Sequence, residues 1–116
     1  MKYLLLVYGD EKKWMGLPEA DRDAVFAECE VYGNEIKASG HFLAGSPLER
    51  SATATTIRRP DGKSIITDGP FAETREVLAG YHLVECKDRD EAVAIGERFP
   101  GLKYGMTIEV RALMID

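Results

Sequence analysis

The chain has 116 residues, 45% of them hydrophobic and 30% charged, which predicts a single globular domain over residues 1–116 and excludes a disordered or membrane-embedded chain. Its formal net charge of −5 comes from 15 basic and 20 acidic residues, and because the basic ones are scattered we expect no nucleic-acid partner. The opening apolar run is too short for a signal peptide or a membrane span, so we expect no membrane contact and a cytoplasmic location.

The first part of the chain predicts a strand, a helix and a second strand. Residues Lys2–Tyr8 are strand formers that are apolar at odd and even positions alike, so both faces of this strand should be covered. A polar loop is expected over Gly9–Gly16, and Pro18 then starts a helix that ends at Gly40. Phe42–Leu48 is predicted to be the second strand. The apolar stripe of the helix has helical spacing and consists of Val25, Cys29, Tyr32 and Ile36.

A β-hairpin is predicted next, with strands over Thr53–Arg59 and Lys63–Thr67. The intervening residues are Pro60, Asp61 and Gly62, which supply the fixed and positive φ angles that a tight turn needs.

The last part predicts a strand, a helix and a final strand. The strand covers Tyr81–Cys86, and Asp88 is expected to cap a helix that Pro100 and Gly101 terminate. Strict alternation of apolar and polar residues then predicts a strand over Gly105–Ile115.

The expected order is therefore β, α, β, hairpin, β, α, β. Without the inserted hairpin this is the α+β plan of ferredoxin-like split βαβ folds, in which both helices cover one face of the sheet. Because the first strand is apolar on both faces, a second copy of the chain is the simplest cover for the other face. We therefore predict a homodimer with its two sheets facing each other.

The segment from Thr67 to Glu76 is the least routine part of the sequence. Pro70 is expected to hold Gly69 in extended geometry, which would fix Asp68 at the end of a strand. One hypothesis makes Asp68 a desolvated general base with a raised pKa in a dimer pocket. The alternative makes it a turn aspartate that accepts N–H groups of the residues after it.

Along most of its length the sequence resembles the YCII-related family, DGPF-domain type. The matching residues are Lys2–Tyr8, Ala44–Leu48, Asp68–Phe71, Glu73–Glu76, Gly80–Tyr81 and Ile108–Arg111. The resemblance implies a dimeric α/β barrel but brings no established reaction. Relatives in the wider group have a histidine on the first helix and an aspartate thought to transfer protons together, and Glu28 stands near the place of that histidine here.

Other charged residues extend the candidate site. Glu73, Arg75 and Glu76 could clamp a polar or anionic ligand or form a surface ion-pair network. Arg111 could anchor a ligand in the dimer space, or pair with Glu109 on the same strand face.

Histidines and cysteines predict no metal site. His41 and His82 are expected to be hydrogen-bonded structural residues, and no carboxylate is spaced to bind a metal with either. Cys29 and Cys86 belong to no Cys-x-x-Cys pair, so both are expected to be buried, reduced thiols.

Three hypotheses for function stay open, of which the last is a structural or fragmentary barrel that binds no ligand. The first is a protein that binds or transforms a small polar molecule in an inter-subunit pocket, with Asp68 as catalytic acid/base and Glu73, Arg75, Glu76 and Arg111 as ligand-binding residues. The second, which the family resemblance implies, is a non-enzymatic regulatory or protein-interaction module, since some relatives are thought to be encoded beside alternative sigma factors. No cofactor is expected in any of these cases.

Overall fold

The computed structural model describes residues 1–115, so Asp116, the last residue of the predicted domain, lies outside the described part. In chain order its elements are β1 (Lys2–Gly9), α1 (Glu11–Gly16), α2 (Glu19–Ala38), β2 (Phe42–Pro47), η1 (Ser51–Thr53), β3 (Thr55–Arg58), η2 (Pro60–Gly62), β4 (Ile65–Asp68), β5 (Val77–Glu85), α3 (Arg89–Glu97), η3 (Pro100–Tyr104) and β6 (Thr107–Ala112), where η marks a 3-10 turn.

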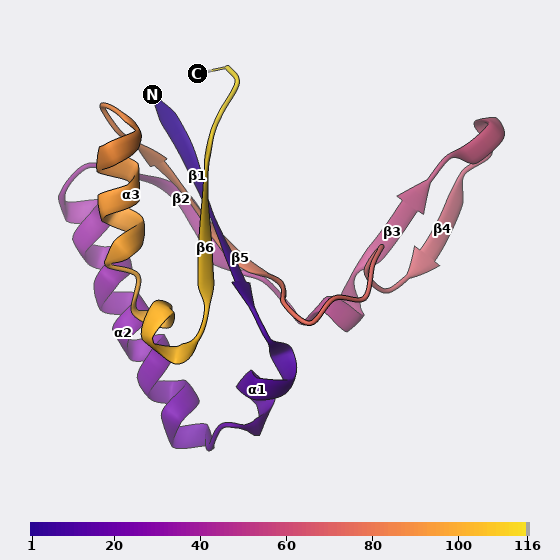
Figure 1. Cartoon of the computed structure of the whole chain (residues 1–116), viewed down its shortest axis with the longest axis horizontal. Coiled ribbons are helices and arrows are strands. Elements are labelled where there is room, and N and C mark those ends of the chain that lie inside the picture. Colours follow the sequence, from indigo (N-terminus) through magenta and orange to yellow (C-terminus); the bar gives the residue numbers. More distant parts are fainter. Residues whose placement is uncertain (116) are drawn as a thin grey trace.

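Four strands form an antiparallel sheet in the order β2-β5-β1-β6. Since each neighbour is antiparallel, α2 joins two parallel strands that flank β5, and α3 joins two parallel strands that flank β1. Figure 1 shows α2 and α3 together on one side of this sheet. The predicted α+β class is confirmed, and in the single chain the sheet is open at both edges and not closed into a barrel.

The two faces of β1 have different surroundings. Tyr3, Leu5 and Val7 are buried in one cluster with side chains of the helices, because α2 and α3 cover that face. Leu4 and Leu6 lie on the other face and are only half-buried. The prediction that this strand is apolar on both sides, with helices for only one, is therefore confirmed.

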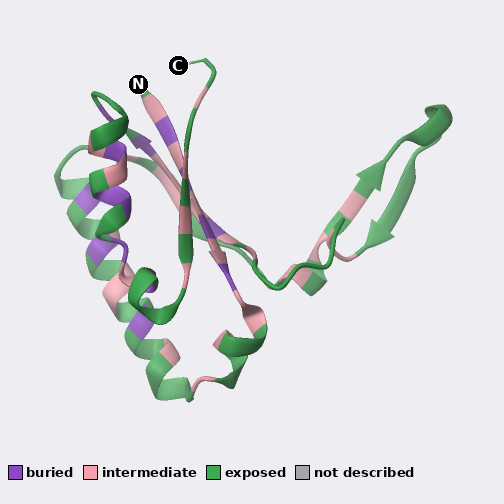
Figure 2. Ribbon diagram, in the orientation of Figure 1, coloured by how far each residue is buried: buried purple, intermediate pink, exposed green. Residues whose placement is uncertain are grey.

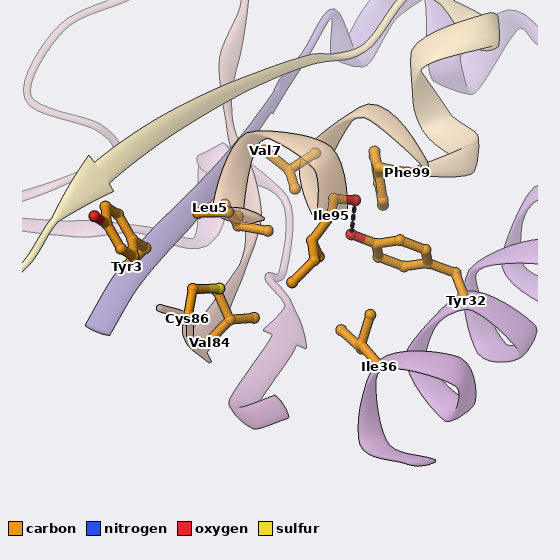
Figure 3. Packing of buried hydrophobic residues seen from close by; sticks show 10 residues of the cluster. Tyr3, Leu5, Val7, Tyr32, Ile36, Val84, Cys86, Ile95 and Phe99 are labelled. Carbon is orange, nitrogen blue, oxygen red and sulfur yellow. Dashed lines mark hydrogen bonds between the residues drawn. The ribbon is translucent and has the colours of Figure 1, made fainter. Parts of the chain in front are cut away.

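The core lies between the four-stranded sheet and the two long helices (Figures 2 and 3). Helix α2 contributes Tyr32 and Ile36, and α3 contributes Ile95. The Tyr32 hydroxyl donates a hydrogen bond of 2.8 Å to the Ile95 carbonyl oxygen, which satisfies the one polar group of this buried ring. Burial raises the pKa of Tyr32 to about 12. This hydroxyl therefore has a structural role.

Strands β3 and β4 form a separate two-stranded sheet, and residues 55–68 are called the arm below. Asp61 and Gly62 have φ angles of 53° and 79°, which confirms the predicted turn. The arm projects from the body on the side of the sheet away from α2 and α3 (Figure 1). The radius of gyration is 16.0 Å, compared with roughly 13 Å for a compact chain of this length. The projecting arm accounts for this difference.

Several local predictions were wrong. Residues 11–16 form helix α1 instead of a loop, because the Asp10 side chain accepts the N–H groups of Lys12 and Lys13 and caps this helix. Gly69 has φ 99° instead of an extended conformation, which glycine adopts without a steric penalty.

Two strand boundaries also differ from the predicted ones. Strand β5 begins at Val77, before the predicted Tyr81, because its early residues pair with the end of β1 and with β2. Strand β6 is shorter than predicted, since η3 continues to Tyr104 and ordered pairing ends at Ala112. Within residues 1–115 no helix has the length and hydropathy needed to cross a membrane.

Candidate functional site

A groove of about 880 Å³ lies between α2 and the strands β2 and β5, with α1 at its mouth. Ligand sites commonly have volumes of roughly 300–1,000 Å³ and mainly apolar walls with a few polar groups. Aromatic residues whose side chains belong to the lining are Trp14, Phe26, Phe42, His82, Phe99 and Tyr104. The groove therefore has the size and the lining of a small-molecule site.

His82 is positioned in the groove wall by the register of three strands. It pairs with Leu5 of β1 on one side and with Gly45 of β2 on the other, so its ring points to the helix-covered face of the sheet. A Cβ at residue 45 would lie 2.9 Å from the Tyr81 carbonyl oxygen and 3.1 Å from His82 Cδ2. Only glycine at this position leaves room for the imidazole ring.

The His82 ring is enclosed by other aromatic side chains. Its centroid lies 5.6 Å from that of Tyr32, 6.0 Å from that of Phe99 and 6.5 Å from that of Phe42. Its Nδ1 atom is buried and has no hydrogen-bond partner among the described residues. Burial lowers the pKa of His82, so the imidazole is neutral at neutral pH. A neutral imidazole can accept or donate one hydrogen bond to a bound molecule and can exchange a proton with it.

At the mouth of the groove, Asp10 connects helix α1 to the segment that precedes β5. Its carboxylate accepts the backbone N–H groups of Lys12 and Lys13 and receives Arg75 Nε at 3.3 Å. The backbone N–H of Lys13 lowers the pKa of Asp10 most, and Arg75 lowers it further. Arg75 is held through its Nε atom, and its side chain is largely exposed beside the groove.

Helix α1 is also connected to the base of the arm. The Glu11 carboxylate accepts the Ser51 backbone N–H at 2.8 Å and forms a short hydrogen bond with the Ser51 hydroxyl. Both bonds lower the pKa of Glu11, the hydroxyl more than the backbone N–H. The mouth of the groove is therefore a connected set of polar contacts between α1, η1 and the segment before β5.

The residues predicted for the site are not all brought together within one chain. Arg75 and Glu76 line the groove. Asp68 ends β4 on the exposed arm, outside the groove, and Glu73 is exposed on the following segment. Arg111 lies on the open face of the sheet. These three residues stay predictions for a pocket that a second subunit would complete.

Arg111 and Glu109 stand on the face of β6 that points away from the helices. Arg111 Nη1 donates a 3.2 Å hydrogen bond to Glu109 Oε1. This pairing on one strand face is one of the two alternatives that the sequence left open for Arg111. Their cross-strand neighbours in β1 are Leu4 and Leu6. The open sheet face is thus an apolar strip with a charged pair along one edge.

Two other residues named from the sequence, Glu28 and His41, make hydrogen bonds or ion pairs with neighbouring side chains. Glu28, near the position of the relatives' helical histidine, binds Lys103 Nζ at 2.7 Å and the Tyr104 hydroxyl at 3.1 Å. His41 contacts Ser39 Oγ at 2.7 Å and Glu91 at 3.2 Å, so both of its ring nitrogens have partners, as expected.

The cysteines are both free thiols. Cys86 is buried as predicted, whereas Cys29 is half-buried in the groove wall. Burial raises the pKa of the Cys29 thiol, which keeps it protonated and unreactive at neutral pH. In residues 1–115 no three His, Cys, Asp or Glu side chains are grouped so that they could hold a metal ion.

Sequence reasoning missed His82 as a site residue and missed helix α1 at the groove mouth. The available signal for His82 was Gly45, which interrupts a predicted strand and proves to be the residue opposite the histidine. That pairing is a tertiary fact, because residues 45 and 82 are adjacent only after β2 and β5 join.

Comparison with known proteins identifies the family. The family profile described as "YCII-related domain" matches residues 1–114 of this chain. An uncharacterized protein of Rhizobium meliloti (strain 1021) is 31% identical over 93 residues, a match that covers 80% of this chain and 75% of the relative. The match of nearly the whole chain to the family profile, supported by this relative, shows that the protein belongs to the YCII-related domain family.

Proposed function

We propose that this protein binds a small molecule in the groove between α2 and the β2–β5 strand pair, with His82 as its polar contact. The observation that carries the proposal is the half-buried His82 imidazole in the wall of a mainly aromatic groove, whose Nδ1 atom has no protein partner. Buried polar atoms in folded proteins nearly always have a partner, and His82 Nδ1 gains one when the ring or its neighbours shift to admit a ligand or a bound water.

The groove defines the class of ligand. Its aromatic wall suits a flat or apolar body, and His82 suits one hydrogen-bonding group on that body. Arg75 at the mouth keeps its terminal guanidinium nitrogens exposed, and a guanidinium is well suited to bind a carboxylate in bidentate fashion. A small aromatic or branched-chain carboxylate of moderate size therefore matches both ends of the groove.

The same proposal includes acid/base chemistry. Because burial lowers the pKa of His82, the neutral ring is available as a general base near neutral pH. Asp68 is the second acid/base candidate, in a pocket that a partner subunit completes. It is the last residue of β4, and the arm projects toward the open side of the sheet.

The proposed state is a homodimer with ferredoxin-like protomers whose open sheet faces meet, as in a dimeric α/β barrel. Support comes from the cross-strand neighbours on that face, where Leu4 stands beside Leu83 and Leu6 stands beside Tyr81. All four are only partly buried in the single chain. A twofold partner covers this strip with the same strip of its own, which is the usual geometry of a homodimer.

A thermal-shift screen with benzoate, phenylacetate, isovalerate and their neutral amides tests the groove. A compound present at 100 times its dissociation constant adds about 2.7 kcal/mol of stability. We expect such a shift for the wild type and for His41→Phe, and its loss in His82→Phe, because only His82 lies in the groove. Arg75→Ala should lose the preference for carboxylates over amides.

Asp68→Asn separates the two acid/base candidates. Asp68 lies outside the groove, so ligand binding there should be unchanged in this variant. A compound that stabilises wild type, His82→Phe and Arg75→Ala equally would show that the groove is not its site. If no compound of the panel stabilises the wild type, the groove proposal fails and the protein-interaction hypothesis gains support.

A further inference from the structure

The arm exposes apolar side chains that nothing in its own chain covers. Ile57 and Ile66 are cross-strand partners on one face of the arm, and they are 68% and 69% exposed. Ile65 on the neighbouring position is also exposed. Figure 2 shows the arm as almost wholly exposed, in contrast to the body. An isolated two-stranded hairpin is marginally stable in water, and exposed isoleucine pairs of this kind normally contact another surface.

The base of the arm is nevertheless firmly attached. The Gly69 N–H donates to the Ala54 carbonyl oxygen at 2.6 Å, and Thr56 Oγ1 donates to the Gly69 carbonyl oxygen at 2.7 Å. Ser51, just before the arm, is bound twice by Glu11 of α1. The first two bonds close the base of the hairpin, and the bonds with Glu11 attach the residues just before it to helix α1.

The arm extends into the space in front of the open sheet face. Figure 1 shows α2 and α3 on one side of the sheet and the arm extending to the other. The half-buried strip of Leu4, Leu6, Tyr81 and Leu83 faces the same side. A second copy that covers the strip therefore lies within reach of the first copy's arm, and twofold symmetry places its own arm beside the first body.

We propose that the arm is an intermolecular clasp, whose Ile57–Ile66 face packs against the body of a second copy of this chain. The inference rests on the proposed homodimer. It adds that the arm, in addition to the sheet faces, holds the two copies together. Each dimer then contains two equivalent arm contacts, and the isoleucines that are exposed in the single chain become part of the interface.

Ile66→Asp and Thr67→Asp are a matched pair for testing the clasp by sedimentation equilibrium. The residues are adjacent in β4 and point to opposite faces of the arm, so both variants add one charge at nearly the same place along the strand. We expect Ile66→Asp to raise the dimer dissociation constant by on the order of 100-fold, because both arms lose a buried apolar contact. Thr67→Asp should change the dissociation constant by less than about threefold. Near-ultraviolet circular dichroism reports whether each body keeps its packing.

Hydrogen exchange of the wild-type amides in residues 55–68 gives a second measurement that needs no variant. These amides should exchange more slowly above the dimer dissociation constant than below it. Equal exchange rates at the two concentrations would overturn the clasp even if the protein dimerises.

Leu6→Glu, on the open sheet face, distinguishes failure of the clasp from failure of the dimer. A wild-type dimer that Leu6→Glu dissociates and Ile66→Asp leaves intact refutes the clasp but keeps the homodimer. A wild type that stays monomeric at high concentration refutes both.

Discussion

Replacement of His82 by phenylalanine should stabilise the protein while removing its ligand response. The imidazole buries Nδ1 without a partner, and an unsatisfied buried polar atom costs about 1–3 kcal/mol. Phenylalanine has nearly the same shape, so the contacts with Tyr32, Phe42 and Phe99 are retained. We therefore expect an increase of about 1–3 kcal/mol in the free energy of unfolding, or roughly 4 °C in Tm per kcal/mol for a chain of this size.

The pH dependence of stability provides a second readout of the same variant. Burial lowers the pKa of His82 in the folded state below its unfolded value, so the unfolded chain binds the proton more readily. Stability is therefore complete above the unfolded pKa of about 6.5 and decreases as the pH falls below it. His82→Phe should lack this part of the decrease.

Urea unfolding of wild type, His82→Phe and His41→Phe between pH 8 and pH 5 measures both effects. His41→Phe serves as the control, since it removes a histidine whose two ring nitrogens have partners and should lower stability. A His82→Phe variant that is less stable than the wild type by 1 kcal/mol or more would refute the reasoning. An unchanged pH slope between pH 7 and pH 5 would refute it as well.

Two further predictions concern the structure around the groove. Gly45→Ala should lower the free energy of unfolding in urea by about 1–3 kcal/mol, since its Cβ would lie 2.9 Å from a backbone oxygen. Gly33→Ala, in open space on α2, should raise it by about 0.5–1 kcal/mol. Equal effects of the two variants would contradict the packing described for β2. Glu11→Gln should weaken the loss of stability in acid, because the two bonds from Ser51 lower the pKa of Glu11 and that contribution disappears as the pH falls through the folded value. Comparison of urea midpoints at pH 7 and pH 3 checks this, with exposed Glu49→Gln as the control that should behave as the wild type does.

The elements of the fold could be predicted from local signals. The stripe on α2, the turn at Asp61–Gly62 and the alternation in β6 each depend on residues close in sequence, and the structure has all three. Helix α1 is only six residues long and could not be predicted from those residues alone. Asp10 caps it, and the distant residues Ser51 and Arg75 bind Glu11 and Asp10 at its start.

The candidate site was predicted only in part, for a related reason. Arg75 and Glu76 were identified from their motif and do line the groove. His82 resembled any histidine in a strand until β2 placed Gly45 beside it and the rings of Tyr32, Phe42 and Phe99 enclosed it.

By itself the sequence determined the order of the strands and the two long helices, the family, and the need to cover a first strand that is apolar on both faces. These depend on local periodicity and on residues within a few positions of one another. The tertiary structure decided which residues form the groove, that His82 Nδ1 has no partner there, and that the arm leaves the body on the open side of the sheet. The physical reason is that burial and hydrogen-bond satisfaction are properties of segments brought together from distant positions, which no local pattern specifies.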